Sequence, residues 1–477
     1  MVMGVFPSSS KGSRDSVDIN IICQASAAHV WNSRNAPPLA SYPNLRAKQD
    51  IHMRQLWLLM ALNLGLAACA VAPPVDRDTE RAMQDADAPG RIAIFRREGE
   101  RIAPTKFIDG NSVELLHNGP ETYSAMEQLI GDARQRIDME SYEFDTVEGG
   151  KFADLLIAKA AQGVTVDLMY DAWGSFETPS SLFDRMRQGG VHVVEFSPFD
   201  PVALATLDLN RRDHRKLLVV DGAVAITGGV NISQVYENRQ RQPQSDDPEQ
   251  LPWRDTDIRM RGPVVAEFER LFVTAWREQK GPALPDMASS GTRAGELQVQ
   301  AVDGAPIDHR PLIYRTLLVA ITLARSSIHL TTGFFVPTPD LEDALEIAAR
   351  RGVDVELVVP SQSDSSMALA AGRARYEDLM AAGVRIFERQ DAVLHAKTAV
   401  IDGVWSTVGS SNLDWRSVVD NAEINAVVLG GAFGGQMEQM FDEDRTRSKA
   451  IEPARWAERP FGERLHEWTA QWLDVLL

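Results

Sequence analysis

The 477-residue sequence contains very little cysteine, with Cys23 and Cys69 as its two cysteines. Two cysteines are too few for a disulfide framework or a four-cysteine zinc site. The His, Asp and Glu residues form no cluster with the spacing of metal ligands. We therefore expect neither a metal ion nor a cofactor.

Basic residues are also scarce relative to acidic ones, because 49 Lys and Arg face 67 Asp and Glu and leave a net charge of −18. Proteins that hold nucleic acid usually carry a basic surface, since phosphate neutralisation supplies most of the affinity. This balance disfavours a nuclease, and we expect no nucleic-acid partner. The hydrophobic content of 44% is that of an ordinary globular protein with a sizeable core.

Apolar runs of the roughly 20 residues that cross a bilayer are missing. The run at 56–68 is shorter, follows Arg54, and ends in Leu66-Ala-Ala-Cys69. A basic start, a short apolar core and small residues are typical of a secretory signal. The segment resembles the lipobox of bacterial lipoproteins, which implies a lipid on Cys69 and an anchor in the cell envelope, facing the periplasm. The alternative is an apolar segment that precedes small residues by coincidence.

Residues 1–52 are rich in Ser, Asn, Arg and Pro and show no periodicity. A signal peptide belongs at the terminus, so we interpret Met53 as the true start and 1–68 as an upstream extension with a signal. Residues 69–99 then form a linker to the first folded lobe.

An internal repeat dominates the rest of the chain. In both halves a Lys lies two residues after a His, an Asp seven, a Gly fourteen and an Asn seventeen. Each position would agree by chance about one time in twenty, so agreement throughout indicates a duplication. The copies are His214, Lys216, Asp221, Gly228 and Asn231, and then His395, Lys397, Asp402, Gly409 and Asn412.

The segments before each motif repeat as well. Residues 137–144 and 164–170 read as strands separated by a helix and a Gly, and 328–335 and 353–360 repeat the pattern. This order predicts an α/β fold of two similar lobes, each a mixed β-sheet flanked by helices, with the active site between them.

The lobe boundaries follow from composition. We place the first lobe at 100–285 and the second at 296–450, because the stretch between them is rich in Gly, Pro, Ala and Ser. Residues 451–477 are expected to form a helical tail. Its apolar residues lie three or four apart, on one helical face. Such a stripe more often packs on a core than lies at a membrane interface, so we expect it to dock on the second lobe. The apolar residues are Phe461, Leu465, Trp468, Trp472 and Leu476.

Each His and Lys pair lies two residues apart, so on a strand both side chains point to the same face. A buried His beside a buried Lys is costly unless an anion meets them, and one phosphate between the lobes would serve both pairs. One imidazole would attack phosphorus and form a phosphohistidine, while the other would protonate the leaving alcohol. Lys216, Lys397, Asn231 and Asn412 would stabilise the charged oxygens. The motif glycines would let the backbone approach the ligand.

A carboxylate behind each imidazole would fix its tautomer. Asp255 and Glu423 are the candidates, with Glu423 expected beside His395 and Asp257 competing with Asp255. Asp221 and Asp402 complete the catalytic motifs. Each precedes a Gly, which indicates a turn, so we expect them to organise the motif, with or without a lysine partner.

These residues are identified as the paired His-x-Lys-x4-Asp signature of the phospholipase D superfamily, and the chain is most similar to bacterial cardiolipin synthases. The similarity lies in Asn210-Arg-Arg-Asp-His214, Gly228-Gly-Val-Asn231, Phe335-Val-Pro337 and Val408-Gly-Ser-Ser-Asn412. It implies phosphatidyl transfer between two phosphatidylglycerol molecules, with His214 as nucleophile and His395 as acid. The family's usual Pro-Tyr before Phe-Val-Pro is Gly333-Phe334 here, and a lipoprotein-like signal replaces two transmembrane helices.

Two other functions compete with this interpretation. A hydrolytic phospholipase D would use the same residues with water as acceptor. A non-catalytic lipid-binding lipoprotein would have lost a catalytic His or Lys, and both sets are intact. In each case the expected partners are a phospholipid and the membrane that holds the anchor.

Overall fold

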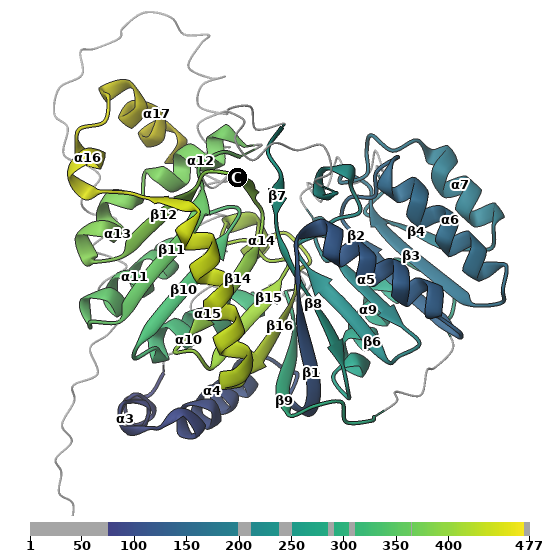
Figure 1. The fold of residues 1–477 in the computed structure, drawn as a ribbon, viewed down its shortest axis with the longest axis horizontal. Helices are drawn as coiled ribbons and strands as arrows, with labels where there is room; N and C mark the ends of the chain where they lie inside the picture. Colours follow the sequence, from purple (N-terminus) through teal and green to yellow (C-terminus); the bar gives the residue numbers. More distant parts are fainter. Residues whose placement is uncertain are drawn as a thin grey trace, which may run out of the picture. The chain divides into compact units, whose positions relative to one another are not determined.

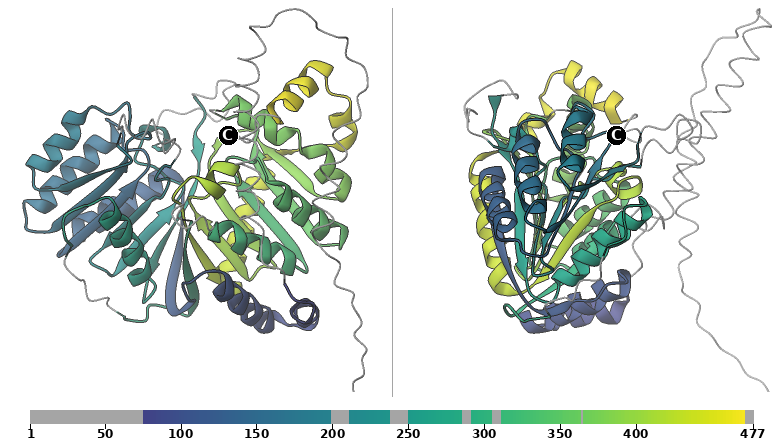
Figure 2. Two further views of the ribbon diagram at one scale, coloured as in Figure 1. Left: turned by 180° about the vertical axis from the view of Figure 1, so that it is seen from behind. Right: turned by 90° about the vertical axis from the view of Figure 1, so that its right-hand side faces the viewer.

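The computed structural model describes residues 75–471 except 199–210, 238–249, 285–290, 305–310 and 364. The proposed start at Met53, the signal and Cys69 lie outside this part. Within it, the α/β prediction is confirmed: two lobes of similar topology carry helices on both sides of their strands (Figures 1 and 2). No helix in the described residues is long and apolar enough to span a membrane.

The first lobe contains a seven-stranded half of the sheet in the order β1-β8-β6-β5-β2-β3-β4. Strands β2, β3 and β4 are parallel, and β5 runs antiparallel to β2. The elements are β1 (Ile108–His117), α5 (Asn118–Asp132), β2 (Arg136–Ser141), α6 (Glu148–Ala160), β3 (Thr165–Asp171), α7 (Ser180–Gln188), β4 (His192–Phe196), β5 (Leu217–Val220), β6 (Val224–Gly228), β8 (Thr256–Arg261) and α9 (Val265–Glu278).

The second lobe repeats this order as β9-β16-β15-β14-β10-β11-β12 and adds β17 at its edge. Its elements are β9 (Leu297–Asp303), α10 (Leu312–Leu323), β10 (Ser327–Thr332), α11 (Pro339–Arg350), β11 (Asp354–Pro360), α12 (Ser366–Arg373), α13 (Tyr376–Ala382), β12 (Arg385–Arg389), β14 (Lys397–Ile401), β15 (Trp405–Gly409), α14 (Trp415–Val419), β16 (Ile424–Leu429), α15 (Gly431–Thr446) and β17 (Ser448–Ala450). The tail forms α16 (Pro453–Ala457) and α17 (Phe461–Gln471).

The duplication also shows in the turns. Gly163 (φ 86°) follows the C-terminal end of α6, and Gly352 (φ 88°) follows α11 at the matching place. Glycine adopts this left-handed backbone conformation at little energetic cost. The conformation turns the chain from the helix into the next parallel strand. The strand–helix–Gly–strand prediction therefore corresponds to β2–α6–β3 and β10–α11–β11.

The strands of the two lobes belong to one continuous sheet. The first residues of β1 pair antiparallel with β9, with an irregularity between Asp109 and Asn111, so hydrogen bonding continues from one lobe into the other. A shared apolar core adds to this connection, and it includes Ile258 and Phe268 of the first lobe and Val408 and Ile424 of the second. The lobes are thus held in one relative orientation.

The stretch expected to be a linker forms α3 (Arg77–Asp85) and α4 (Ala88–Ile102) instead. Met83 and Phe95 are buried in the core of the second lobe, and α4 packs against α10. Asp76 and Asp87 cap the two helices by accepting backbone N–H groups at 2.8 and 2.9 Å. A polar composition concealed these two short amphipathic helices, whose few apolar residues face the second lobe.

Candidate active site

The two histidine motifs lie at the same edge of the sheet. His214 and Lys216 precede β5, which runs antiparallel to β2, so they lie where β2 ends. His395 precedes β14 and Lys397 begins it, so this pair lies where β10 ends. All four side chains are almost fully buried. Their proximity shows in the pKa of His214, which is lowered well below its usual value first by burial and then by Lys216, Lys397 and His395.

Each histidine bonds a carboxylate of the opposite lobe. Nδ1 of His214 lies 3.0 Å from both carboxylate oxygens of Glu423. Nδ1 of His395 lies 2.7 Å from Oδ2 of Asp255. Both carboxylates are inaccessible to solvent. Because Nδ1 is engaged in each ring, Nε2 is the nitrogen left to act on a substrate.

The expected pairing of His395 with Glu423 was therefore wrong. Backbone contacts between the lobes explain why each histidine has a carboxylate partner from the opposite lobe. The N–H of His214 donates to the carbonyl of Ala422 at 2.9 Å, next to Glu423. In the other half, the N–H of His395 donates to the carbonyl of Arg254 at 2.8 Å, next to Asp255. The short strands β7 (Trp253–Arg254) and β13 (Val393–Leu394) pair in parallel and fix this register. Each half of the site is thus completed by the other lobe.

Asp255 is the residue beside His395, and its competitor Asp257 has another role. The carboxylate of Asp257 accepts the N–H of Val230 at 3.1 Å, and burial raises its pKa to about 8. Asp257 therefore supports the segment that leads to Asn231 and does not bond a histidine.

The lysines carry charge into a buried site. Nζ of Lys216 donates to the carbonyl of His214 at 2.6 Å, and Nζ of Lys397 donates to that of His395. Burial, followed by the nearby positive charge of Lys397, lowers the pKa of Lys216 to about 7, although Glu423 raises it. Such a group gains stability as a cation when an anion is bound, which is what a phosphodiester provides.

The asparagines occupy matching places in the two motifs. Asn231 donates from Nδ2 to the hydroxyl of Tyr236 at 3.3 Å and accepts the N–H of Glu143 at 3.3 Å. Oδ1 of Asn412 is buried and has no hydrogen-bond partner among the described residues. Asn412 also lines a small, mainly apolar cavity with Lys397. The second asparagine therefore keeps unused hydrogen-bonding capacity beside the motif lysine Lys397.

The motif glycines serve packing instead of ligand approach. A Cβ atom on Gly229 would lie 2.1 Å from Oδ1 of Asp255, and one on Gly228 would lie 1.9 Å from Oδ1 of Asp257. In the second motif Ser410 takes the place of Gly229 and donates its hydroxyl to Glu423 at 2.5 Å. In the first motif, therefore, Gly228 and Gly229 leave room for the neighbouring carboxylates Asp257 and Asp255.

Asp221 and Asp402 lie at the other ends of their strands, away from the histidines. Asp221 (φ 53°) accepts the N–H groups of 134–136 at 2.7–2.8 Å. Asp402 (φ 52°) accepts those of 325–327 at 2.7–3.1 Å. Both carboxylates bind the backbone just before β2 or β10. Their place among the catalytic residues is therefore corrected to that of structural organisers, because their oxygens are occupied at the far edge.

Aromatic residues surround the histidines; the sequence did not single out Tyr236 or Tyr142, whereas it did single out Phe334. The hydroxyl of Tyr236 lies 3.1 Å from Nδ1 of His395, and the ring of Tyr142 lies 5.1 Å from that of His214. Phe334 lies 6.4 Å from His395 between ring centroids, so the family tyrosine would indeed place a hydroxyl beside this site. Tyr236 has no counterpart in the repeat, which is why the repeat could not identify it.

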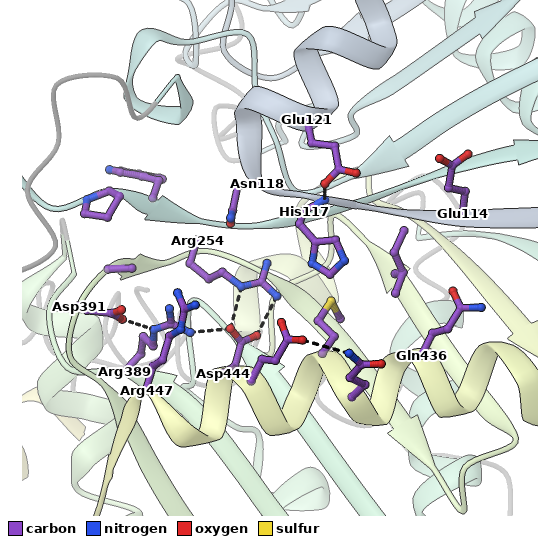
Figure 3. Close-up of a pocket in the computed structure, with 17 residues that line it drawn as sticks. Glu114, His117, Asn118, Glu121, Arg254, Arg389, Asp391, Gln436, Asp444 and Arg447 are labelled. Atoms are coloured by element: carbon purple, nitrogen blue, oxygen red, sulfur yellow. Dashed lines mark hydrogen bonds and ion pairs between the residues drawn. The ribbon is translucent and has the colours of Figure 1, made fainter.

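A polar cleft of about 580 Å³ lies between the lobes beside β7 and β13 (Figure 3). It adjoins the site through Trp253, whose ring is 5.3 Å from that of His395. Arg254 of the first lobe bonds Asp444 of the second at 2.8 Å, and Asp444 also bonds Arg389 at 2.5 Å. The buried Arg254–Asp444 pair links the two lobes, whereas Arg389 and Asp444 both belong to the second lobe. The charged lining is unsuited to acyl chains.

Comparisons with known proteins agree with this geometry. A family profile described as "Cardiolipin synthase, PLD-like domain" matches residues 126–241 and 317–445. A cardiolipin synthase of Geobacillus thermodenitrificans is 33% identical over 371 residues, covering 76% of this chain and 72% of that protein. Cardiolipin synthase 2 of Bacillus anthracis is 32% identical over 391 residues, covering 80% and 74%.

A solved structure shows the same fold. Phosphatidylserine synthase of Haemophilus influenzae superposes with a TM-score of 0.61 at 13% identity, covering 80% of this chain and 100% of that one. The family profile and the relatives, together with this fold, confirm the resemblance to phospholipase D-type enzymes. With both halves of its duplicated site matched by one family profile, the chain belongs to the cardiolipin synthase family of PLD-like domain proteins.

Proposed function

We propose that this protein is a phosphatidyltransferase that moves a phosphatidyl group from one phosphatidylglycerol molecule to another and releases glycerol. The observation that carries the proposal is the pair of buried histidines, each held by a carboxylate of the opposite lobe and each followed by a buried lysine. Such a site supplies two imidazoles and two cations to a single phosphate. Its relatives named cardiolipin synthases support phosphatidylglycerol as substrate.

In the first step Nε2 of His214 attacks the phosphorus of the donor lipid. A P–N bond forms, the P–O bond to glycerol breaks, and His395 gives its proton to the departing oxygen. Lys216, Lys397 and the asparagines stabilise the non-bridging oxygens.

In the second step the now neutral His395 removes a proton from the hydroxyl of a second phosphatidylglycerol. That oxygen attacks phosphorus, the P–N bond breaks, and His214 returns to its neutral form. The product contains two phosphatidyl groups joined by one glycerol, so the atoms and charges balance without any cofactor.

The surroundings of the two imidazoles support different roles for them. The pKa of His214 is lowered well below its usual value by burial and by three neighbouring cationic groups. The pKa of His395 is also lowered by burial and Lys397, but Asp255 raises it. Asp255 thus favours the protonated form of His395 against the effect of burial. This difference favours His214 as nucleophile and His395 as acid, with Asp255 in place of Glu423 as the carboxylate that supports the acid.

Product analysis separates transfer from hydrolysis. Incubating pure protein with phosphatidylglycerol should yield cardiolipin and one glycerol per cardiolipin, identified by mass spectrometry. Added glycerol should slow the reaction by reversing the first step. Phosphatidic acid as the main product would instead identify the hydrolytic phospholipase D, and no turnover of any phospholipid would leave the lipid-binding lipoprotein.

Activity should be unaffected by thorough chelation of divalent ions. Lys216 and Lys397 already supply positive charge to the phosphate, and the described residues contain no group of three His, Cys, Asp or Glu side chains arranged to hold a metal. Turnover after treatment with a chelator is the measurement, with untreated enzyme as control. Activity regained only on adding a divalent ion would contradict the prediction.

We further propose that Cys69 is lipidated and anchors the protein to the bacterial cell envelope on its periplasmic side. Cells grown with a fatty-acid analogue should label the wild-type protein, whereas Cys69→Ser should remain unlabelled. A mature terminus upstream of Cys69, found by mass spectrometry, would refute the anchor while leaving the chemistry intact.

A further inference from the structure

Exposed apolar side chains are unevenly distributed over the described residues. Eight large hydrophobic residues are at least 41% exposed, and Ile347 on α11 is the one that lies away from the active-site edge of the sheet. α11 begins after β10 and leads into β11, so Ile347, near its C-terminal end, lies at the edge where β11 starts. The other seven lie at the edge where the parallel strands end.

In the first lobe, three of these residues follow β2 and β3. Val147 precedes α6, and Trp173 and Phe176 lie in the turn after β3, where Phe176 is 72% exposed. All three line an open groove of about 690 Å³ that also contains Ser233, two residues after Asn231. The apolar side chains of this lobe therefore lie along a groove beside the segment that follows Asn231.

In the second lobe, Met367 lies on α12, which follows the end of β11, and α17 packs against α12 (Figure 1). Ala470 of α17 is buried in a small cluster with residues of α12, and Phe334 packs against this cluster. Because the Phe334 ring lies 6.4 Å from His395, α17 borders the entrance to the second motif.

The exposed side of α17 was expected to be core. Instead Glu467, which is bonded to Arg459, and Ala470 are its buried residues. Phe461 is 77% and Leu465 is 46% exposed, and Trp468 is exposed in the same stripe. Trp472 and Leu476 lie outside the described residues. An apolar stripe that faces outward exposes apolar surface to water, which is unfavourable. Contact with another apolar phase removes that exposure.

We propose that these apolar residues form one docking rim that inserts into the surface of the phospholipid bilayer and presents the two histidines to the lipid headgroups. The rim comprises the turns after β2 and β3 together with α12 and α17. This inference rests on the proposed function, because a diacyl donor keeps its acyl chains in the bilayer while its phosphate is attacked. Aromatic side chains favour the region between headgroups and acyl chains.

Charge argues for insertion instead of electrostatic attraction. With a net charge of −18 the chain is repelled by a phosphatidylglycerol surface, so apolar contact has to provide the affinity. Binding should therefore persist or strengthen as salt screens the repulsion.

The test uses the full-length chain with Cys69→Ser, so that no acyl anchor contributes. Flotation with vesicles of equal parts phosphatidylglycerol and phosphatidylcholine compares this protein with the added pair Phe461→Ser and Leu465→Ser. Ile347→Ser is the matched control, because Ile347 is 52% exposed but lies away from the rim. Turnover of a monomeric short-chain phosphatidylglycerol is measured beside turnover of vesicles.

The paired change should weaken vesicle binding by about tenfold or more, since two apolar side chains no longer enter the bilayer. Vesicle turnover should fall in parallel while short-chain turnover stays unchanged, which also shows that the variant is folded. Equal binding by the paired variant, equal loss with Ile347→Ser, or loss of binding in high salt would overturn the proposal. So would a wild-type dimer that the paired change dissociates, because a second copy would then cover the rim. Intact vesicle binding without any phospholipid turnover would count against the proposed function alone.

Discussion

Replacing His214 with alanine should lower turnover of phosphatidylglycerol by at least about 100-fold, and replacing His395 should do the same. Each ring has a different task, His214 as nucleophile and His395 as acid and base. The buried site offers no second imidazole that could replace either ring. The assay is cardiolipin formation by pure protein at saturating lipid. His329→Ala is a matched control, because His329 is also bonded to a glutamate, Glu438, but sits on β10 outside the site.

An activated donor separates the two roles. A phosphatidyl ester of p-nitrophenol releases a leaving group that needs no proton, so the first step no longer requires an acid. His395→Ala should then release about one equivalent of p-nitrophenol per enzyme and stall, because no base activates the acceptor. His214→Ala should release none.

Mass spectrometry of the stalled protein identifies the nucleophile directly. The phosphatidyl adduct is expected on His214. An adduct on His395 in the wild type would reverse the roles, and near-normal activity of either alanine variant would contradict a shared two-histidine site.

The sequence was sufficient to predict the lobes and the histidine–lysine pairs, because a duplication repeats its spacing in both copies. Local rules also predicted that Asp221 and Asp402 organise turns, since each precedes a glycine. Three features of the structure could not be predicted from local sequence rules. The first is the choice between Asp255 and Asp257 as the partner of His395, which depends on how β8 passes Gly228 and Gly229.

The carboxylate partners are the second feature, because they depend on contacts between the lobes. His214 receives Glu423 only because its backbone pairs with Ala422, 208 residues further along the chain. A local pattern contains no information on such pairing. The third feature is α17: its spacing correctly indicated a helix with one apolar stripe, but spacing alone does not say whether the stripe faces the core or the outside.

Asp255→Asn should lower kcat/KM for phosphatidylglycerol by at least about 100-fold at neutral pH. The amide keeps the size of the side chain but removes the charge that raises the pKa of His395 and can present an N–H to Nδ1, which selects the wrong tautomer. His395 then loses both its orientation and its capacity to hold the proton for the leaving group.

The pH profile distinguishes this role from a structural one. Burial and Lys397 already lower the pKa of His395, so its protonated fraction in the free enzyme falls as pH rises through a value below 6.5. The alkaline limb of kcat/KM reports this loss. Without the Asp255 charge the pKa falls further, and the limb should move to lower pH. Asp257→Asn is the matched control, because a pKa of about 8 leaves Asp257 largely protonated at neutral pH and an amide resembles that form. If Asp257→Asn shifted the limb as far as Asp255→Asn did, or if Asp255→Asn left it in place, the carboxylate across the lobe boundary would not be the group that sustains the acid.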